Sequence, residues 1–95
     1  MVEIDLNALL EDIHILTEQL SAFEERYGLL SEVFYDWYSV GNEPENDAWV
    51  MDFTEWAGLY RSRQLLMTEY RSFIQKRIVN DQNAINRHLR SYAAV

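Results

Sequence analysis

A row of apolar residues runs through the first thirty positions at alternating intervals of three and four. Its members are Val2, Leu6, Leu9, Ile13, Leu16, Leu20, Phe23, Tyr27 and Leu30. This spacing places them all on one side of a helix, as in a coiled coil or a helical bundle, and Leu10 widens the row toward a bundle face. We predict a helix over about 5–27, with Asp5 as its N-cap and Gly28 as a left-handed C-cap.

The later segments are also expected to be helical, because the chain has only three glycines and one proline. We predict a short helix over 31–40, capped by Ser31 and closed by Gly41. A loop, "GNEPEND", follows it. After this loop we predict a long helix over about 52–79. The start of that helix is ambiguous between Asp47 and Asp52, and Asp52 with Glu55 has the spacing of a capping box.

The predicted fold is all-α, with one long, one short and one long helix forming an antiparallel hairpin or bundle. Residues 1–79 form a single domain, and residues 80–95 add a basic C-terminal helix or tail. A chain of 95 residues has room for one core only, and small cores often gain stability from oligomerisation. We therefore expect a homodimer to complete the bundle.

The charges are divided unevenly along the chain. Residues 1–59 contain fourteen Asp and Glu but one basic residue, Arg26, whereas residues 60–95 contain two acidic and seven basic residues. An antiparallel hairpin would lay the basic segment along the acidic first helix, within the chain or across a dimer. The alternative is a small nucleic-acid contact by Arg87 and Arg90. The basic residues are dispersed, which favours the pairing between helices.

Composition excludes several classes of protein. The absence of cysteine removes disulfides, zinc–thiolate sites and thiol nucleophiles. The first residues lack the basic start and continuous apolar run of a signal peptide, and no stretch reaches the roughly 20 apolar residues of a membrane span. We expect a cytoplasmic protein. The net charge of −8 argues against nucleic-acid binding by the domain as a whole.

Metal and catalytic sites are not expected. Glu11 and His14 have the spacing found in half of a di-iron helix, but they lie on the outer side relative to Leu9 and Ile13. Paired carboxylates need burial or a like-charged neighbour to act as acids and bases, whereas those of this chain lie on solvated faces and in a loop. No nucleophile elbow or phosphate-binding loop is present. We expect no enzymatic activity and no cofactor.

Aromatic residues are concentrated in the middle of the chain, where ten of the thirteen lie between Phe23 and Tyr60. Four fit the apolar rows and are expected in the core: Phe23, Phe53, Trp56 and Tyr60. Four others cluster near a short helix and a loop that cannot bury them all: Tyr35, Trp37, Tyr38 and Trp49. Exposed Trp and Tyr among acidic residues are typical of protein-binding surfaces. We predict these four as partner anchors, with Glu43, Glu45 and Asp47 as steering charges.

Residues 24–66 resemble small acidic antitoxin-like proteins of bacterial toxin–antitoxin modules, a type frequent in cyanobacteria. The matching residues are Tyr27, Gly28, Ser31, Phe34, Tyr35, Gly41, Glu55, Trp56, Leu59 and Tyr60. The resemblance covers less than half of the chain, and its motif is structural rather than catalytic. The chain departs from the pattern in the longer loop and in the basic extension after about residue 75, which leaves the partner open.

The resemblance implies a non-enzymatic interaction protein that neutralises a basic toxin. The acidic and aromatic residues favour the same function, because an acidic surface with aromatic anchors complements a basic partner. Two alternatives stay open. One is a DNA-binding regulator that uses the basic C-terminal segment, and the other is a structural subunit of a helical bundle without a dedicated partner.

Overall fold

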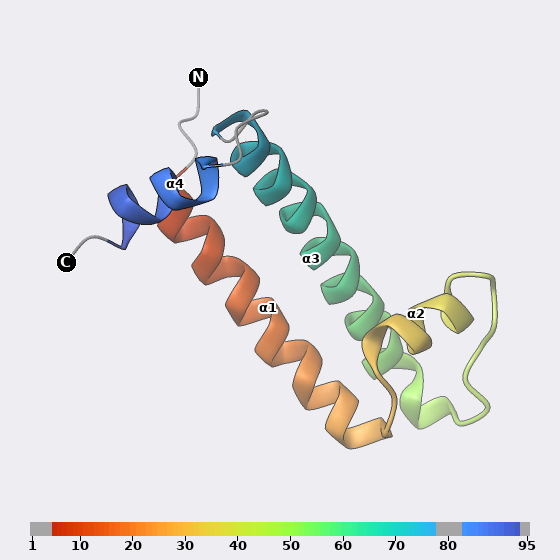
Figure 1. Ribbon diagram of the computed structural model, residues 1–95. Helices are drawn as coiled ribbons and strands as arrows, with labels where there is room; N and C mark the ends of the chain where they lie inside the picture. Colours follow the sequence, from red (N-terminus) through yellow and green to blue (C-terminus); the bar gives the residue numbers. More distant parts are fainter. Residues whose placement is uncertain (1–4, 78–82, 94–95) are drawn as a thin grey trace.

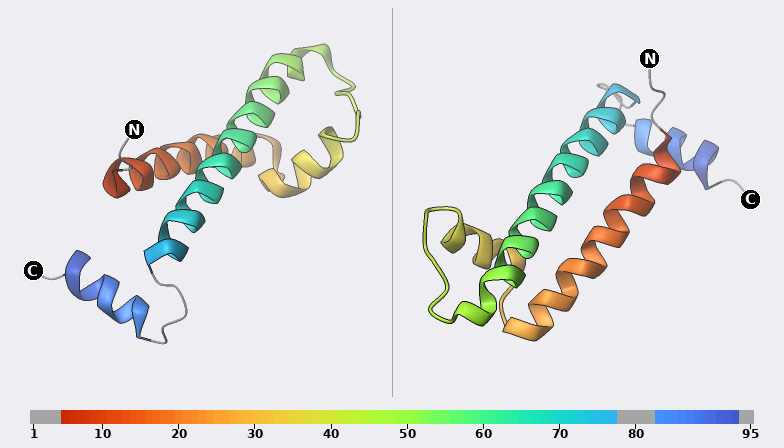
Figure 2. Two further views of the ribbon diagram at one scale, coloured as in Figure 1. Left: turned by 90° about the horizontal axis from the view of Figure 1, so that it is seen from above. Right: turned by 180° about the vertical axis from the view of Figure 1, so that it is seen from behind.

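The computed structural model of the protein describes residues 5–77 and 83–93, and all of its regular structure is helical. The helices are α1 (Leu6–Tyr27), α2 (Ser31–Tyr38) and α3 (Val50–Arg77), followed by α4 (Ala84–Tyr92), with a 3₁₀ turn η1 (Asp47–Trp49) before α3. The long helices α1 and α3 lie side by side and antiparallel (Figure 1). α2 lies at one end of this hairpin and α4 at the other (Figures 1 and 2). The all-α prediction is confirmed.

α1 forms as its sequence predicts. The Asp5 carboxylate accepts hydrogen bonds from the backbone N–H groups of Asn7 and Ala8, at 3.0 and 3.4 Å. Gly28 ends the helix in the left-handed region, with φ of 68°, and its N–H donates to the Glu24 carbonyl oxygen. The apolar row faces inward, and its buried members are Leu9, Ile13, Leu20 and Phe23. Val2 lies outside the described residues.

α2 starts differently from the prediction, because Leu30 rather than Ser31 occupies the N-cap position. Ser31 is the first helical residue and is buried. Its N–H donates to a carboxylate oxygen of Glu24, at 2.9 Å, so a side chain of α1 caps α2. α2 ends at Tyr38, two residues earlier than predicted. The Asn42 side chain donates to the Trp37 carbonyl oxygen at that end of the helix.

α3 begins at Val50, and the predicted capping box at Asp52 is wrong. The Asn46 side chain accepts a hydrogen bond from the N–H of Ala48 and caps the preceding turn η1. Asp52 therefore lies within the first turn of α3, and its carboxylate bonds to α1 instead. The described part of α3 ends at Arg77, and positions 78–79 of the predicted helix lie outside the described residues. α4 shows that residues 84–92 of the basic extension are helical.

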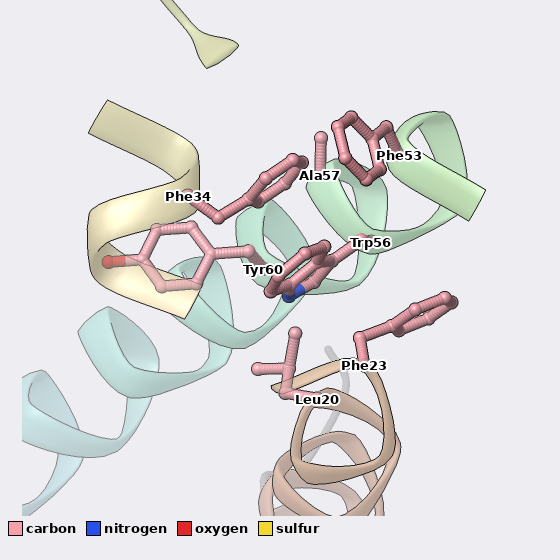
Figure 3. Packing of buried hydrophobic residues seen from close by; sticks show 7 residues of the cluster. All are labelled: Leu20, Phe23, Phe34, Phe53, Trp56, Ala57 and Tyr60. Carbon is pink, nitrogen blue, oxygen red and sulfur yellow. The ribbon is translucent and has the colours of Figure 1, made fainter. Parts of the chain in front are cut away.

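The core is an aromatic cluster where α2 packs against the hairpin (Figure 3). Its buried members are Leu20, Phe23, Phe34, Phe53, Trp56, Ala57 and Tyr60. The rings of Phe34 and Trp56 are stacked, with centroids 3.8 Å apart, and Phe23 stacks on the same indole at 5.6 Å. Trp56 is 0 % exposed. The four aromatic residues predicted for the core are all buried, and they join α1 to α3.

Among the described side chains, the charge pairing predicted between the helices is not formed within the chain. The ion pair that joins them has the opposite polarity, with Arg26 of α1 contacting Asp52 of α3 at 2.8 Å. Arg63 of α3 donates to the Thr17 hydroxyl oxygen, at 2.9 Å. Among the side chains that the structure describes, no Lys or Arg of α3 forms an ion pair with α1. Arg61, Arg71 and Lys76 of α3 are exposed.

Candidate protein-binding surface

Exposed apolar side chains gather around α2. Of the thirteen large apolar residues that are exposed in the described part of the chain, eight lie between residues 29 and 51. They are Leu29, Leu30, Val33, Trp37, Val40, Trp49, Val50 and Met51. We call residues 29–51 with these side chains the α2 surface. Soluble monomers rarely expose large contiguous apolar patches, and such patches commonly mark interaction sites.

A pocket of about 430 Å³ lies within the α2 surface. Its apolar lining combines the buried rings of Phe34 and Phe53 with the partly exposed side chains of Trp37 and Trp49. The lining is completed by Leu29, Val33, Glu43, Pro44 and Glu45. A mostly apolar concavity with a few polar groups is the usual form of a binding site. This pocket brings together two of the four predicted aromatic anchors and two of the three predicted steering charges.

Both tryptophans of the pocket rest on Phe53, which positions them. Trp49 is stacked on Phe53, with centroids 6.0 Å apart, and presents an edge to Tyr27 at 6.2 Å. Trp37 stands nearly perpendicular to Phe53 at 6.2 Å. Within the described residues, neither indole N–H donates a hydrogen bond, in contrast to that of the buried Trp56. Each exposed tryptophan therefore offers an apolar ring and a free donor to another molecule.

The pocket lies in an anionic environment. No Lys or Arg occurs between Arg26 and Arg61, and this interval contains seven carboxylates. Glu43, Glu45 and Asp47 are exposed and form no hydrogen bond or ion pair through their side chains with any described residue. Because Glu43 and Glu45 are unpaired and lie in the lining of an apolar pocket, they favour a cationic ligand with an apolar anchor.

The other predicted anchors lie outside this pocket. Tyr38 stacks on Phe34 with centroids 5.2 Å apart, and lines a second depression of about 500 Å³ together with Glu43 and Asp47. Tyr35 is half-buried and packs against Tyr60 at 4.8 Å. Tyr35 therefore belongs to the edge of the core rather than to the pocket.

Five residues that line the pocket are not among the predicted partner-binding residues: Leu29, Val33, Phe34, Pro44 and Phe53. A signal exists for Val33, because Val33 and Trp37 are four positions apart in α2 and so fall on one helical face. The spacing alone does not identify a binding face, because a helix of about two turns contains too few positions to distinguish a binding face from a core face.

The remaining predicted contacts lie far from the α2 surface in the fold. Arg87 and Arg90 are exposed on α4 at the opposite end of the hairpin.

Glu11 and His14 are exposed on α1, as their position relative to the apolar row predicts. Among residues 5–77 and 83–93, no group of three or more potential ligands is placed to hold a metal ion. No described helix combines the length and apolar character needed to cross a membrane.

Comparisons of the chain with protein-family models, with curated proteins and with solved structures found no match.

Proposed function

We propose that the protein is a non-enzymatic interaction module whose α2 surface binds a basic protein. The observation that carries the proposal is the 430 Å³ apolar pocket, lined by Trp37 and Trp49 and bordered by the unpaired carboxylates Glu43 and Glu45. Trp37 is 41 % exposed and Trp49 is 38 % exposed. Each tryptophan therefore has a large apolar area left to bury against a partner.

The two kinds of residue have different tasks in this proposal. Tryptophans dominate the energetics of many interfaces, because a large rigid ring is desolvated at small conformational cost. Exposed charges contribute less to affinity and more to the rate and orientation of encounter. Trp37 and Trp49 would thus determine the lifetime of the complex, while Glu43, Glu45 and Asp47 would attract the basic partner.

The resemblance of residues 24–66 to antitoxin-like proteins supports a small basic toxin as that partner. A toxin that acts on RNA needs cationic side chains to hold phosphates. An anionic surface with aromatic anchors is suited to cover such a site. We therefore propose an antitoxin role, in which the α2 surface blocks the RNA-binding face of the toxin.

The test is co-purification of the tagged full-length chain from its native cells, with identification of the bound proteins. We expect a basic protein to be recovered by the wild type. Trp37→Ala/Trp49→Ala should weaken its binding by about 30-fold or more, as expected for a loss of about 2 kcal/mol at an interface hot spot. The matched control Ile15→Ala/Leu65→Ala removes two exposed apolar side chains away from the α2 surface and should leave binding unchanged.

A charge variant separates steering from anchoring. Glu43→Gln/Glu45→Gln should mainly slow association and reduce its dependence on salt, whereas Glu11→Gln/Glu18→Gln on the exposed face of α1 should change neither. The proposal would be contradicted if the recovered partner were acidic, or if the tryptophan double variant and its control Ile15→Ala/Leu65→Ala bound the partner equally well.

A further inference from the structure

The pocket of the α2 surface is lined by aromatic rings of several orientations. Trp49 lies nearly parallel to Phe53, at 22°, whereas Trp37 stands at 89° to the same ring. The two indoles are therefore steeply inclined to each other. Phe34 adds a fourth ring, at 72° to Phe53, and all four line one concavity. Aromatic rings around a small space form the cages that bind organic cations, because the face of each ring carries negative charge density.

Among the described residues, no Lys or Arg lines this pocket. Arg26, which precedes the segment, contacts Asp52 at 2.8 Å and lies over the ring of Phe23, with its Cζ atom 5.8 Å from the ring centroid. The aromatic cluster thus already accepts one guanidinium of the chain itself, on Phe23. The rings of the pocket are left to receive a cation from another molecule.

The charge and the size of the pocket both suit a single cationic side chain. Glu43 and Glu45 belong to its lining, and neither forms an ion pair with a described residue. The volume of about 430 Å³ lies at the lower end of the roughly 300–1,000 Å³ that is usual for ligand pockets. It is therefore suited to one side chain or one small molecule.

Arginine fits such a pocket better than lysine does. A mostly apolar space requires a cation to lose its water, and a guanidinium is more weakly hydrated than an ammonium group. The guanidinium plane also stacks on aromatic rings, and its forked N–H donors match a carboxylate such as that of Glu43 or Glu45. The methylene groups of the arginine would contact the apolar part of the lining, at Leu29 and Val33.

We propose that the pocket is an aromatic cage that receives one arginine side chain of the basic partner. The inference rests on the proposed function for the source of the arginine, and it deepens that function by naming the chemistry of the anchor. The rings provide the preference for a cation, because exposed carboxylates form ion pairs of little net affinity. Glu43 and Glu45 attract and orient the side chain before the rings cover it.

Three small probes test the cage on the full-length chain: the N-acetyl methylamides of arginine, citrulline and lysine. Citrulline has a neutral urea in place of the guanidinium and nearly the same shape, so the comparison isolates the charge. Shifts of the backbone N–H signals of Val33 and Glu45 in a ¹H–¹⁵N spectrum measure binding at millimolar probe concentrations. The arginine probe should bind about fivefold or more tightly than the citrulline probe, and more tightly than the lysine probe.

Two double variants separate the rings from the carboxylates. Trp37→Leu/Trp49→Leu keeps apolar side chains but removes the indole faces, so the preference for arginine over citrulline should disappear. Glu43→Gln/Glu45→Gln should lower arginine binding by less than about fivefold and should keep the preference. All four positions are exposed, and unchanged helical circular dichroism would show that both variants remain folded.

The outcomes distinguish this inference from the proposed function. Equal binding of the arginine and citrulline probes, or binding of neither, would overturn the cage. Equal binding of the arginine and lysine probes would overturn the assignment of arginine, and a preference that is lost with the carboxylates but kept without the indoles would contradict the role of the rings.

The proposed function would survive these results if a basic partner still depended on Trp37 and Trp49, because the anchor in the pocket would then be apolar. A pocket that selects arginine, in a protein without any basic partner, would support the cage and contradict the proposed function.

Discussion

The indole Nε1–H of Trp56 donates a hydrogen bond to the hydroxyl oxygen of Ser31, at 2.9 Å, in the interior of the protein. The same hydroxyl donates to a carboxylate oxygen of Glu24 at 2.7 Å. Ser31 of α2 therefore provides the acceptor for the buried indole N–H of Trp56 in α3, and it connects this indole to Glu24 of α1. This link holds α2 against the hairpin together with the stacking of Phe34 on Trp56.

Ser31→Ala should destabilise the protein by about 1–3 kcal/mol, because it leaves the buried indole N–H without an acceptor. For a domain of this size, that corresponds to a fall of roughly 5–20 °C in the thermal unfolding midpoint, which circular dichroism can measure. Ser39→Ala, at the exposed end of α2, is the control and should change stability by less than about 0.5 kcal/mol. Equal effects at the two serines would refute the role assigned to Ser31.

Two glycine substitutions should act in opposite directions. Gly28 has φ of +68°, so Gly28→Ala should lose about 1–2 kcal/mol. Gly58 lies within α3, and an added Cβ there would meet no atom within 4 Å. Gly58→Ala should therefore stabilise the protein by about 0.5–1 kcal/mol. Urea unfolding measures both changes, and a stabilising Gly28→Ala would contradict the left-handed cap.

Stability should depend on pH through Asp52. Its carboxylate accepts hydrogen bonds from the Tyr27 hydroxyl at 2.6 Å and from Arg26 at 2.8 Å, and these bonds lower the pKa of Asp52 below its usual 3.8. The same hydrogen bond raises the pKa of Tyr27 above 10.0. The stability that the Asp52 carboxylate contributes is thus fully present above pH 3.8, and it is lost as the pH falls through the lowered pKa of Asp52. The stability that the Tyr27 hydroxyl contributes is fully present below pH 10.0, and it is lost as the pH rises through the raised pKa of Tyr27.

The measurement is the unfolding midpoint of the wild type and of Asp52→Asn as a function of pH. The wild type should be the more stable between pH 3.8 and 10.0, and the difference should close toward both extremes. Glu55→Gln removes another carboxylate of α3, one that is exposed, and controls for net charge. A difference that does not vary with pH would rule out the proposed coupling.

Much of the fold could be predicted from the sequence because its signals are periodic. The row from Leu6 to Tyr27 specifies α1 and its buried face, and Asp5 and Gly28 specify its ends. The start of α2 could not be predicted, because the group that caps it is the carboxylate of Glu24, seven residues earlier in another helix. The same applies to Asp52, whose spacing suits a cap but whose partners are Arg26 and Tyr27.

The sequence indicates which kinds of residue form the candidate site, but not how they are arranged in space. The aromatic residues near α2 stand out as too many for a small core, which indicates a surface. Which of these aromatic residues belong to the pocket is determined by tertiary packing. Trp37 and Trp49 both contact Phe53, whereas Tyr35 packs against Tyr60. Neighbours in sequence, such as Tyr35 and Trp37, point to different sides of a helix, and only the packing of α2 determines which side is covered.

The three tryptophan indole N–H signals in a ¹H–¹⁵N spectrum, followed during titration with the co-purified basic protein, test the α2 surface most directly. Trp37 and Trp49 should shift or broaden in proportion to complex formation. Trp56, buried and bonded to Ser31, should stay in place and serve as an internal reference. A complex that leaves Trp37 and Trp49 unchanged while signals of α1 or α4 move would contradict the binding role of this surface.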